Sequence, residues 1–292
     1  MTNAAAQIET PLSPGVIEQY WSNGFLFPVS AIPLEAAAEA RAELEALEQT
    51  WQSADLPHPL TTYKRVNAHV VMPLVARLAT MPEVLDAVGA VIGPDILLYA
   101  AELFIKEPRT THVVTMHQDL TYWGLGAIDG MVTAWIALSP ATRASGCMDF
   151  VKGSHKNAIL QHEDTFAENN LLSRGQEVKV DVKDSDKTAI TLAPGEFSLH
   201  HGLTIHGSGP NASDDRRIGV VVRYLNPEIR QQNADLDYAA LVRGEDRYGN
   251  FQHIPLATTE FSPEALRLYD EIRAARAQIL MQGAQGRSEA YQ

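Results

Sequence analysis

Short apolar runs separated by turn-forming residues occupy the middle of the chain, from about residue 95 to residue 225. The runs lie at residues 96–105, 131–138, 147–151, 177–180, 196–199 and 218–224. Glycine, proline, serine and asparagine gather between them, for example at residues 207–211. Short strands punctuated by such turns predict an antiparallel barrel or jelly roll.

Helical segments flank this β-rich region on both sides. Helices are expected to begin near Pro14, Pro33, Pro82 and Pro263, because proline fits the first turn of a helix. The expected helices cover residues 13–24, 33–51, 81–93 and 262–280. The chain shows neither an internal repeat nor a dividing linker. The sequence therefore predicts a single domain over residues 1–292, made of a helical N-terminal part at 13–92, a β core at 95–225 and a C-terminal helix at 262–280.

Composition and charge narrow the classes of partner. Apolar residues make up 45% of the chain, which is enough to bury a large core. The net charge of −13 argues against nucleic acid or an anionic membrane as a partner, because both attract clustered lysine and arginine. Cys147 is the only cysteine in the sequence, so a reducing, cytoplasmic setting is the simplest interpretation. We expect a small-molecule partner and a monomer or homodimer.

The pattern His-x-Asp, which can supply two ligands to one metal ion, occurs twice. Chance supplies about one match of a histidine with an acidic residue at this spacing, so the context has to separate the two. His117 and Asp119 follow a strand-like run, and in an extended segment residues i and i+2 face the same side. His162 and Asp164 fall in a stretch typical of a loop or helix, where these positions diverge. We expect the first pair to share a metal ion and the second to lie on the solvated surface.

A third ligand would complete such a site. Two histidines and one carboxylate on one face of a metal ion leave other positions open, as in the non-haem iron(II) oxygenases. His206 is one candidate for the third ligand, since a turn follows it and Arg217 lies on the returning strand. His200 and His201 are the alternatives.

Arg217 is the expected anchor for a carboxylate. Its planar guanidinium can make two parallel hydrogen bonds to such a group. An oxoacid that chelates iron at one end needs an anchor of this kind at its other end. Arg216 is the alternative, and since neighbouring residues on a strand face opposite sides, only one of the two can point inward.

Four segments, in this order and spacing, resemble the phytanoyl-CoA dioxygenase family. They are residues 116–122 (MHQDLTY), 133–135 (TAW), 145–156 (SGCMDFVKGSHK) and 206–211 (HGSGPN), followed by Arg217. The likeness extends over about residues 65–225, and the set is far more specific than any one segment. It implies a mainly β fold with flanking helices, namely a double-stranded β-helix of the jelly-roll, cupin-like kind.

The resemblance also implies a cofactor and a co-substrate. Iron(II) would be held by His117, Asp119 and His206, and 2-oxoglutarate and O2 would bind beside it. Arg217 corresponds to the arginine that binds the distal carboxylate of 2-oxoglutarate. Halogenating relatives replace the acidic ligand with a small residue, so the presence of Asp119 favours hydroxylation. Positions that line the co-substrate pocket in the family are occupied here by Ser208, Trp135, Leu103 and Arg65.

The expected function is hydroxylation of an unactivated C–H bond of a small metabolite, with release of succinate and CO2. An acyl-CoA or a secondary metabolite is an alternative substrate, and a non-catalytic jelly-roll protein that binds a small ligand is the alternative outside enzymes. Tyr122 and Trp123 follow the metal motif, so they are candidate substrate contacts besides packing residues. Lys106 and Arg223 could meet an anionic substrate or lie in solvent as ordinary charges.

Overall fold

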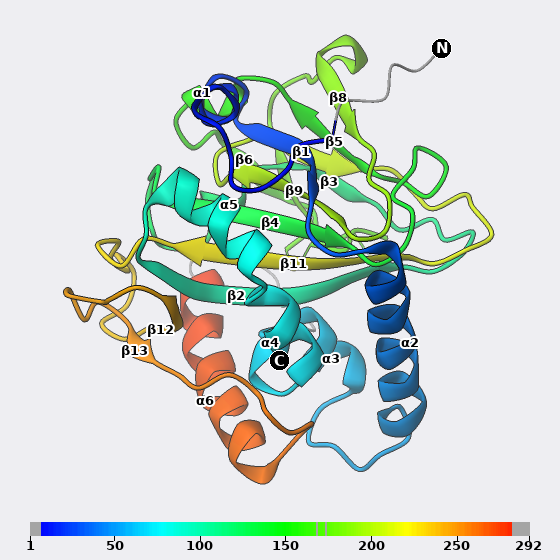
Figure 1. The fold of residues 1–292 in the computed structure, drawn as a ribbon, viewed down its shortest axis with the longest axis vertical. Helices are drawn as coiled ribbons and strands as arrows, with labels where there is room; N and C mark the ends of the chain where they lie inside the picture. Colours follow the sequence, from blue (N-terminus) through cyan, green and yellow to red (C-terminus); the bar gives the residue numbers. More distant parts are fainter. Residues whose placement is uncertain (1–6, 168, 173, 282–292) are drawn as a thin grey trace.

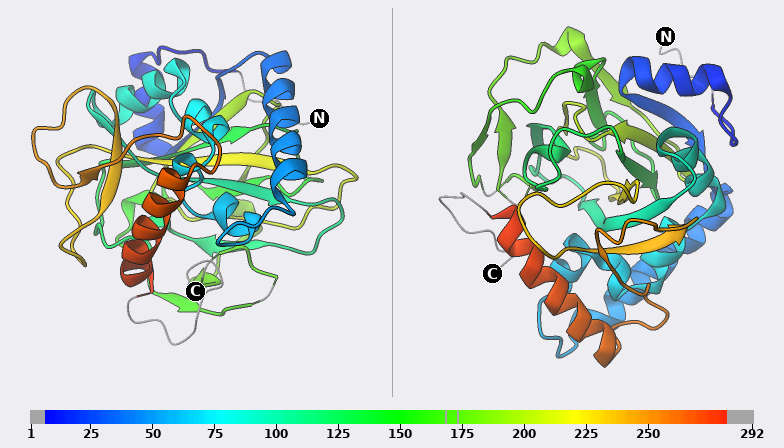
Figure 2. Two further views of the ribbon diagram at one scale, coloured as in Figure 1. Left: turned by 90° about the horizontal axis from the view of Figure 1, so that it is seen from below. Right: turned by 90° about the vertical axis from the view of Figure 1, so that its left-hand side faces the viewer.

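The computed structural model describes residues 7–167, 169–172 and 174–281, in which two antiparallel sheets face each other and helices cover the outer side of the larger sheet (Figures 1 and 2). The large sheet has the strand order β1-β9-β4-β11-β2-β12-β13, and the small sheet has the order β3-β10-β5-β8. The strand pairs are antiparallel except for β12 and β13, which run parallel. The arrangement is a jelly roll with flanking helices, as the sequence predicts.

The elements have the following bounds. The strands are β1 Phe25–Ser30, β2 Ile96–Lys106, β3 Val114–His117, β4 Met131–Ala137, β5 Met148–Val151, β6 His162–Asp164, β7 Gln176–Val178, β8 Lys187–Ile190, β9 Glu196–His201, β10 His206–Ser208, β11 Arg217–Leu225, β12 Tyr238–Arg243 and β13 Gln252–His253. The α-helices are α1 Pro14–Asn23, α2 Leu34–Trp51, α3 Leu60–Arg65, α4 Pro73–Ala79, α5 Pro82–Ile92 and α6 Pro263–Leu280. Among the short 3₁₀ turns, η2 Asp119–Thr121 bears on the site.

The central strands of the large sheet are buried on both faces. Successive side chains on a strand point to opposite faces. Ala134 and Val220 therefore belong to the core that the sheet shares with the helices, whereas Trp135 and Val221 pack in the core between the two sheets. This two-sided burial explains why these strands are nearly continuous apolar runs in the sequence. It also decides which side chains reach the space between the sheets.

The four helices expected from the sequence are confirmed, within one or two residues, as α1, α2, α5 and α6. Proline occupies the first turn of α1, α5 and α6. Gly93 follows α5 with φ of 98°, a conformation that favours glycine. The Ser262 hydroxyl accepts a hydrogen bond from the backbone N–H of Ala265 at 3.2 Å and so caps α6. Within the described residues, none of the helices is both long enough and apolar enough to cross a membrane.

The bounds expected for the helical and β parts need correction. Strand β1 lies inside the part expected to be helical and pairs with β9 at the edge of the large sheet. Pro28 interrupts its apolar run, which suits an edge strand. Strand β12 extends the large sheet beyond residue 225. Helices α3 and α4 and the short strands β3, β8 and β10 were not predicted, because segments of three to seven residues take their structure largely from their neighbours.

The expectation that His162 and Asp164 lie on the solvated surface is wrong. They lie on β6, which pairs with β7, and both are only partly exposed. His162 Nε2 accepts a hydrogen bond from the backbone N–H of Gln118 at 3.1 Å, and Asp164 accepts one from the Tyr122 hydroxyl at 2.7 Å. This second His-x-Asp pair therefore supports the segment that contains the first pair.

Candidate metal centre and the pocket beside it

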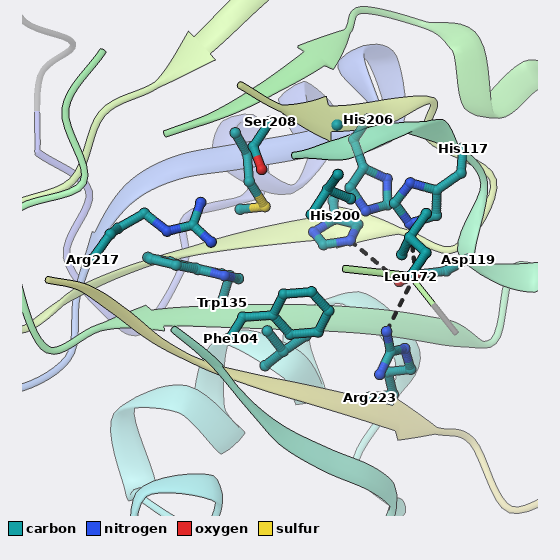
Figure 3. Close-up of a pocket in the computed structure, with 14 residues that line it drawn as sticks. Phe104, His117, Asp119, Trp135, Leu172, His200, His206, Ser208, Arg217 and Arg223 are labelled. Carbon is teal, nitrogen blue, oxygen red and sulfur yellow. Dashed lines mark hydrogen bonds and ion pairs between the residues drawn. The ribbon is translucent and has the colours of Figure 1, made fainter. Parts of the chain in front are cut away.

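Two adjacent strands of the small sheet bring His117, Asp119 and His206 together (Figure 3). His117 ends β3 and is the cross-strand partner of His206, which begins β10. Gln118 is extended, so Asp119, at the start of η2, faces the same side as His117. One potential ligand atom from each of the three side chains lies within 4.8 Å of the other two, and all three residues are buried. Two imidazoles and a carboxylate at this spacing can hold one divalent metal ion.

Backbone hydrogen bonds orient both imidazole rings. Nδ1 of His117 lies 2.9 Å from the carbonyl oxygen of Thr115, and Nδ1 of His206 lies 2.9 Å from that of Thr204. A carbonyl oxygen only accepts, so in both rings Nδ1 carries the proton and Nε2 keeps its lone pair for a metal ion. Burial, followed by the neighbouring His117, holds the pKa of His206 well below its usual range. The ring is thus neutral, which is the form that binds metals.

The carboxylate of Asp119 is fixed from several sides. The Thr133 hydroxyl donates a hydrogen bond to Oδ2 at 2.9 Å, and Arg223 Nη2 approaches Oδ1 at 3.4 Å. Burial alone would raise the pKa of Asp119, but Arg223 and the histidines around it lower that pKa well below its usual range. Asp119 is therefore ionised and carries the negative charge that a cation needs.

His200 and His201 lie outside the three-residue group. His200 is buried beside it, with Nε2 3.4 Å from Asp119 Oδ2, and it lines the same pocket. His201 points elsewhere, since its Nδ1 accepts a hydrogen bond from the backbone N–H of Leu203 and its Nε2 lies 3.2 Å from Asp129. Of the two alternatives, His200 alone is near enough to influence the group.

A pocket leads from the three residues into the space between the sheets. The space between its lining residues amounts to about 410 Å³, part of which is open to solvent. Its lining consists of Phe104, Val114, His117, Asp119, Trp135, Met148, Leu172, His200, His206, Gly207, Ser208, Arg217, Val221 and Arg223. The metal-binding group and Arg217 lie at opposite ends of the pocket, with Trp135 and Phe104 between them (Figure 3).

Arg217 is a buried cation, 1% exposed. Its Nη1 donates to the carbonyl oxygen of Gly146 at 2.7 Å, and its guanidinium carbon lies 5.2 Å from the centre of the Trp135 ring. Nε has no hydrogen-bond acceptor, and no carboxylate of the described residues pairs with the group. Burial lowers the pKa of Arg217 to about 10, so the side chain stays charged at neutral pH. A buried positive charge without a counter-ion is suited to bind a carboxylate.

Arg216 faces the opposite side of β11, as strand alternation predicts. Its guanidinium forms ion pairs with Glu48 and Glu107, with N–O distances of 2.8 and 3.0 Å. These carboxylates balance the charge of Arg216 on the face of β11 that points away from the pocket. Arg216 is therefore a matched control for Arg217.

Of the four other residues expected to line the co-substrate pocket, two do so and two lie outside the lining. Ser208 and Trp135 line the pocket. Leu103 packs in the core on the helix side of β2, and strand alternation turns Phe104 to the pocket instead. Arg65 lies behind Phe104, with its guanidinium carbon 3.9 Å from the ring centre, and it donates a hydrogen bond to the carbonyl oxygen of Leu171.

Of the four candidate substrate contacts, one lines the pocket and three do not. Arg223 lines the pocket and donates to Glu102 at 2.6 Å. Trp123 lies beneath Arg223 and is 8% exposed, and Tyr122 makes the hydrogen bond to Asp164. Lys106 is fully buried, so the interpretation of a solvated charge is wrong for this residue.

Sequence reasoning did not predict which residues hold the carboxylate of Asp119, although it singled out Arg223 as a candidate substrate contact. Thr133 and Arg223 are cross-strand partners on β4 and β11, and both reach Asp119. Glu102 faces Arg223 from β2. The signal available was a charged residue inside an otherwise apolar strand, since such a residue requires a buried partner.

A sequence model described as phytanoyl-CoA dioxygenase (PhyH) matches residues 20–219, which include the three grouped residues and Arg217. The chain belongs to the phytanoyl-CoA dioxygenase family. A probable phytanoyl-CoA dioxygenase of Caenorhabditis elegans is 29% identical over 163 residues, which cover 54% of this chain and 52% of the relative. A probable alpha-ketoglutarate-dependent hypophosphite dioxygenase of Stutzerimonas stutzeri is 27% identical over 160 residues, which cover 54% and 55% of the two chains.

A solved structure matches this chain over a longer stretch than these relatives do. The structure of apo ThoJ, described as a non-heme monooxygenase, superposes with a TM-score of 0.83 at 30% identity. That match covers 93% of this chain and 100% of ThoJ. By contrast, the chain spans about half the length of the curated phytanoyl-CoA dioxygenase relatives that it matches.

Proposed function

We propose that this member of the phytanoyl-CoA dioxygenase family is an iron(II)- and 2-oxoglutarate-dependent dioxygenase that hydroxylates a C–H bond of a small molecule. The observation that carries the proposal is the pairing of two features at opposite ends of one pocket. One is the buried group of two imidazoles and an ionised carboxylate, and the other is the buried guanidinium of Arg217 without a counter-ion. A bidentate oxoacid with a second carboxylate complements both ends.

The chain's residues have defined roles in this proposal. His117, Asp119 and His206 bind the iron, and Thr133 and Arg223 hold the Asp119 carboxylate in place. Arg217 and Ser208 bind the distal carboxylate of 2-oxoglutarate, while Trp135 and Phe104 form the walls between the two ends. Arg65 and Leu103 support the pocket from outside its lining.

The bound iron, together with 2-oxoglutarate and O2, supplies the oxidising chemistry, and 2-oxoglutarate leaves as succinate and CO2. The protein's part is to orient the reactants and to exclude water. The buried lining does this, because His117, Asp119 and His206 are only 3%, 7% and 6% exposed.

The substrate class is a small metabolite in this proposal. Arg223 is retained as a candidate contact because it lines the pocket near Asp119, while Tyr122 and Trp123 lie outside the pocket lining, Trp123 packing beneath Arg223. The relatives described as a probable phytanoyl-CoA dioxygenase and a probable hypophosphite dioxygenase point to substrates of very different size. A single domain, a cytoplasmic location and a monomer or homodimer stay predictions.

Succinate formation tests the proposal and searches for the substrate at once. The purified chain is incubated with iron(II), 2-oxoglutarate and O2, with and without each candidate metabolite. We expect O2-dependent succinate that one class of compound stimulates. If the chain forms no succinate with or without any candidate while it binds a small ligand tightly, the interpretation as a non-catalytic jelly-roll binding protein is favoured instead.

Asp119→Gly should reduce hydroxylation by about 10²-fold or more. The variant removes one metal ligand, and changes to residues that only support a ligand already cost about 10- to 100-fold in metal affinity or activity. Arg223 keeps its ion pair with Glu102. Efficient halogenation is not expected in this variant, because the residues around a metal also direct the substrate. The measurement is product formation with iron(II) and 2-oxoglutarate in the presence and absence of chloride. Hydroxylation at the wild-type rate would mean that Asp119 is not a ligand.

A further inference from the structure

Two buried basic side chains face each other at the end of the pocket remote from the metal-binding group. Lys106 on β2 and Arg217 on β11 are direct cross-strand partners, and they are 0% and 1% exposed. Like charges opposite each other destabilise a sheet. Within the described residues neither side chain forms an ion pair, because the recorded acceptors are Gly146, Ser208 and Gly209. In their protonated forms both side chains therefore lack a counter-ion among the described residues, which suits this end of the pocket to an anion.

Lys106 makes its contacts through β10. Its ammonium donates to the Ser208 hydroxyl oxygen at 2.7 Å, to the Ser208 carbonyl oxygen at 3.3 Å and to the carbonyl oxygen of Gly209. A lysine ammonium has no lone pair, so the bond to the hydroxyl uses an acceptor site of Ser208 and leaves the hydroxyl proton free. In the described structure Ser208 donates this proton to no other residue, and Ser208 lines the pocket together with Arg217.

We propose that Lys106 is a positioning residue for the co-substrate: it holds the Ser208 hydroxyl so that its proton is donated into the pocket, beside Arg217, to the distal carboxylate. When the carboxylate is bound, protonated Lys106 adds its charge to that of Arg217 at this end of the pocket. Lys106 does not line the pocket, so it acts through Ser208 and not by contact. The inference rests on the proposed function, because it takes 2-oxoglutarate as the occupant.

A pH dependence follows from the same arrangement. Arg217 from β11 and the Cys147 thiol before β5 are the titratable groups that face Lys106. Burial, followed by Arg217, lowers the pKa of Lys106 to about 6, whereas burial raises the pKa of Cys147 and keeps it neutral. A carboxylate nearby raises the pKa of Lys106, so binding takes up a proton at neutral pH. The affinity for 2-oxoglutarate should therefore fall as the pH rises from about 6 to 8.

A double-mutant cycle on full-length protein loaded with Mn(II) tests the inference. The dissociation constant of 2-oxoglutarate is measured by calorimetry for the wild type, Lys106→Met, Ser208→Ala and the double variant. We expect Ser208→Ala to weaken binding about 10-fold and Lys106→Met about 10- to 30-fold. The double variant should match Lys106→Met within about 3-fold, because the serine is of little use once the lysine is gone.

A second variant covers the case in which Lys106→Met does not fold. Lys106→Gln keeps an N–H donor for Ser208 but removes the charge, so it should weaken binding by only a fewfold. The dissociation constant of the wild type should rise between pH 6.5 and pH 8 by more than that of Lys106→Gln. A lysine that only stabilises the turn at Gly209 would instead lower the melting temperature without changing either measure.

The outcomes separate this inference from the function on which it rests. Wild-type protein that does not bind 2-oxoglutarate would overturn the proposed function. If the wild type, Lys106→Gln and Lys106→Met all bind 2-oxoglutarate equally well, the inference alone is overturned. Strictly multiplicative losses in the double variant would also overturn it, because Lys106 would then act independently of Ser208.

Discussion

Replacing Arg217 with methionine should weaken the binding of 2-oxoglutarate by about 10²-fold or more. Arg217 is proposed to make two charge-assisted hydrogen bonds to the distal carboxylate, and each contributes about 1.5–3 kcal/mol. Since about 1.4 kcal/mol corresponds to a factor of ten, the loss of both exceeds a hundredfold. Lysine keeps the charge but not the planar fork, so Arg217→Lys should lose only part of this. The measurement is succinate formation at increasing 2-oxoglutarate.

The neighbouring arginine provides the control. Arg216 is engaged by Glu48 and Glu107 on the outer face of β11, so Arg216→Met should leave the 2-oxoglutarate requirement unchanged. Iron binding should survive in both variants, since neither side chain is part of the metal-binding group. A higher requirement in Arg216→Met than in Arg217→Met would mean that the other face of this strand binds the co-substrate. An unchanged requirement in both would count against 2-oxoglutarate altogether.

Replacing His206 with alanine should lower the affinity for iron(II) by about 10²-fold or more. Changes to residues that merely support a ligand cost about 10- to 100-fold in metal affinity, so the loss of a ligand exceeds this. His117→Ala should behave in the same way. Metal content after dialysis against a defined concentration of free iron(II), followed by turnover, gives the measurement.

Variants of two other histidines test whether His206 or His200 is the third ligand. His200→Ala should keep more iron than His206→Ala, because His200 lies beside Asp119 but outside the group of three. His253→Ala is a control that should leave the iron content unchanged, since that side chain is exposed and pairs with Asp246. His162 is unsuitable as a control, because it accepts a hydrogen bond from the backbone of Gln118 between two proposed ligands. Full iron content in His206→Ala with loss in His200→Ala would reassign the third ligand.

The sequence predicted the β-rich core and the shared orientation of His117 and Asp119 for physical reasons. Long strands buried on both faces are continuous apolar runs, which is why β2, β4 and β11 were recognisable. The i, i+2 spacing of His117 and Asp119 places them on one side of any extended segment. Their meeting with His206 depends on the pairing of β3 with β10, and that followed only from the resemblance of the combined motifs.

What the sequence could not supply was the burial and register of individual side chains. Lys106 has no feature that distinguishes a buried lysine from a solvated one, because its burial comes from β10 and from its cross-strand partner Arg217. The choice between Leu103 and Phe104 depends on the register of β2 against β11. His162 lies on a strand of three residues, which is recognisable only by its partner β7.

The central claim is that one pocket binds iron(II) and 2-oxoglutarate together, and absorption spectroscopy without oxygen tests it most directly. An oxoacid that chelates iron(II) gives a charge-transfer band in the visible range that neither component shows alone. We predict this band in the wild type, its loss in His206→Ala, and its appearance in Arg217→Met only at about 10²-fold higher 2-oxoglutarate. Folded wild-type protein that shows no band with saturating iron(II) and 2-oxoglutarate would contradict the account.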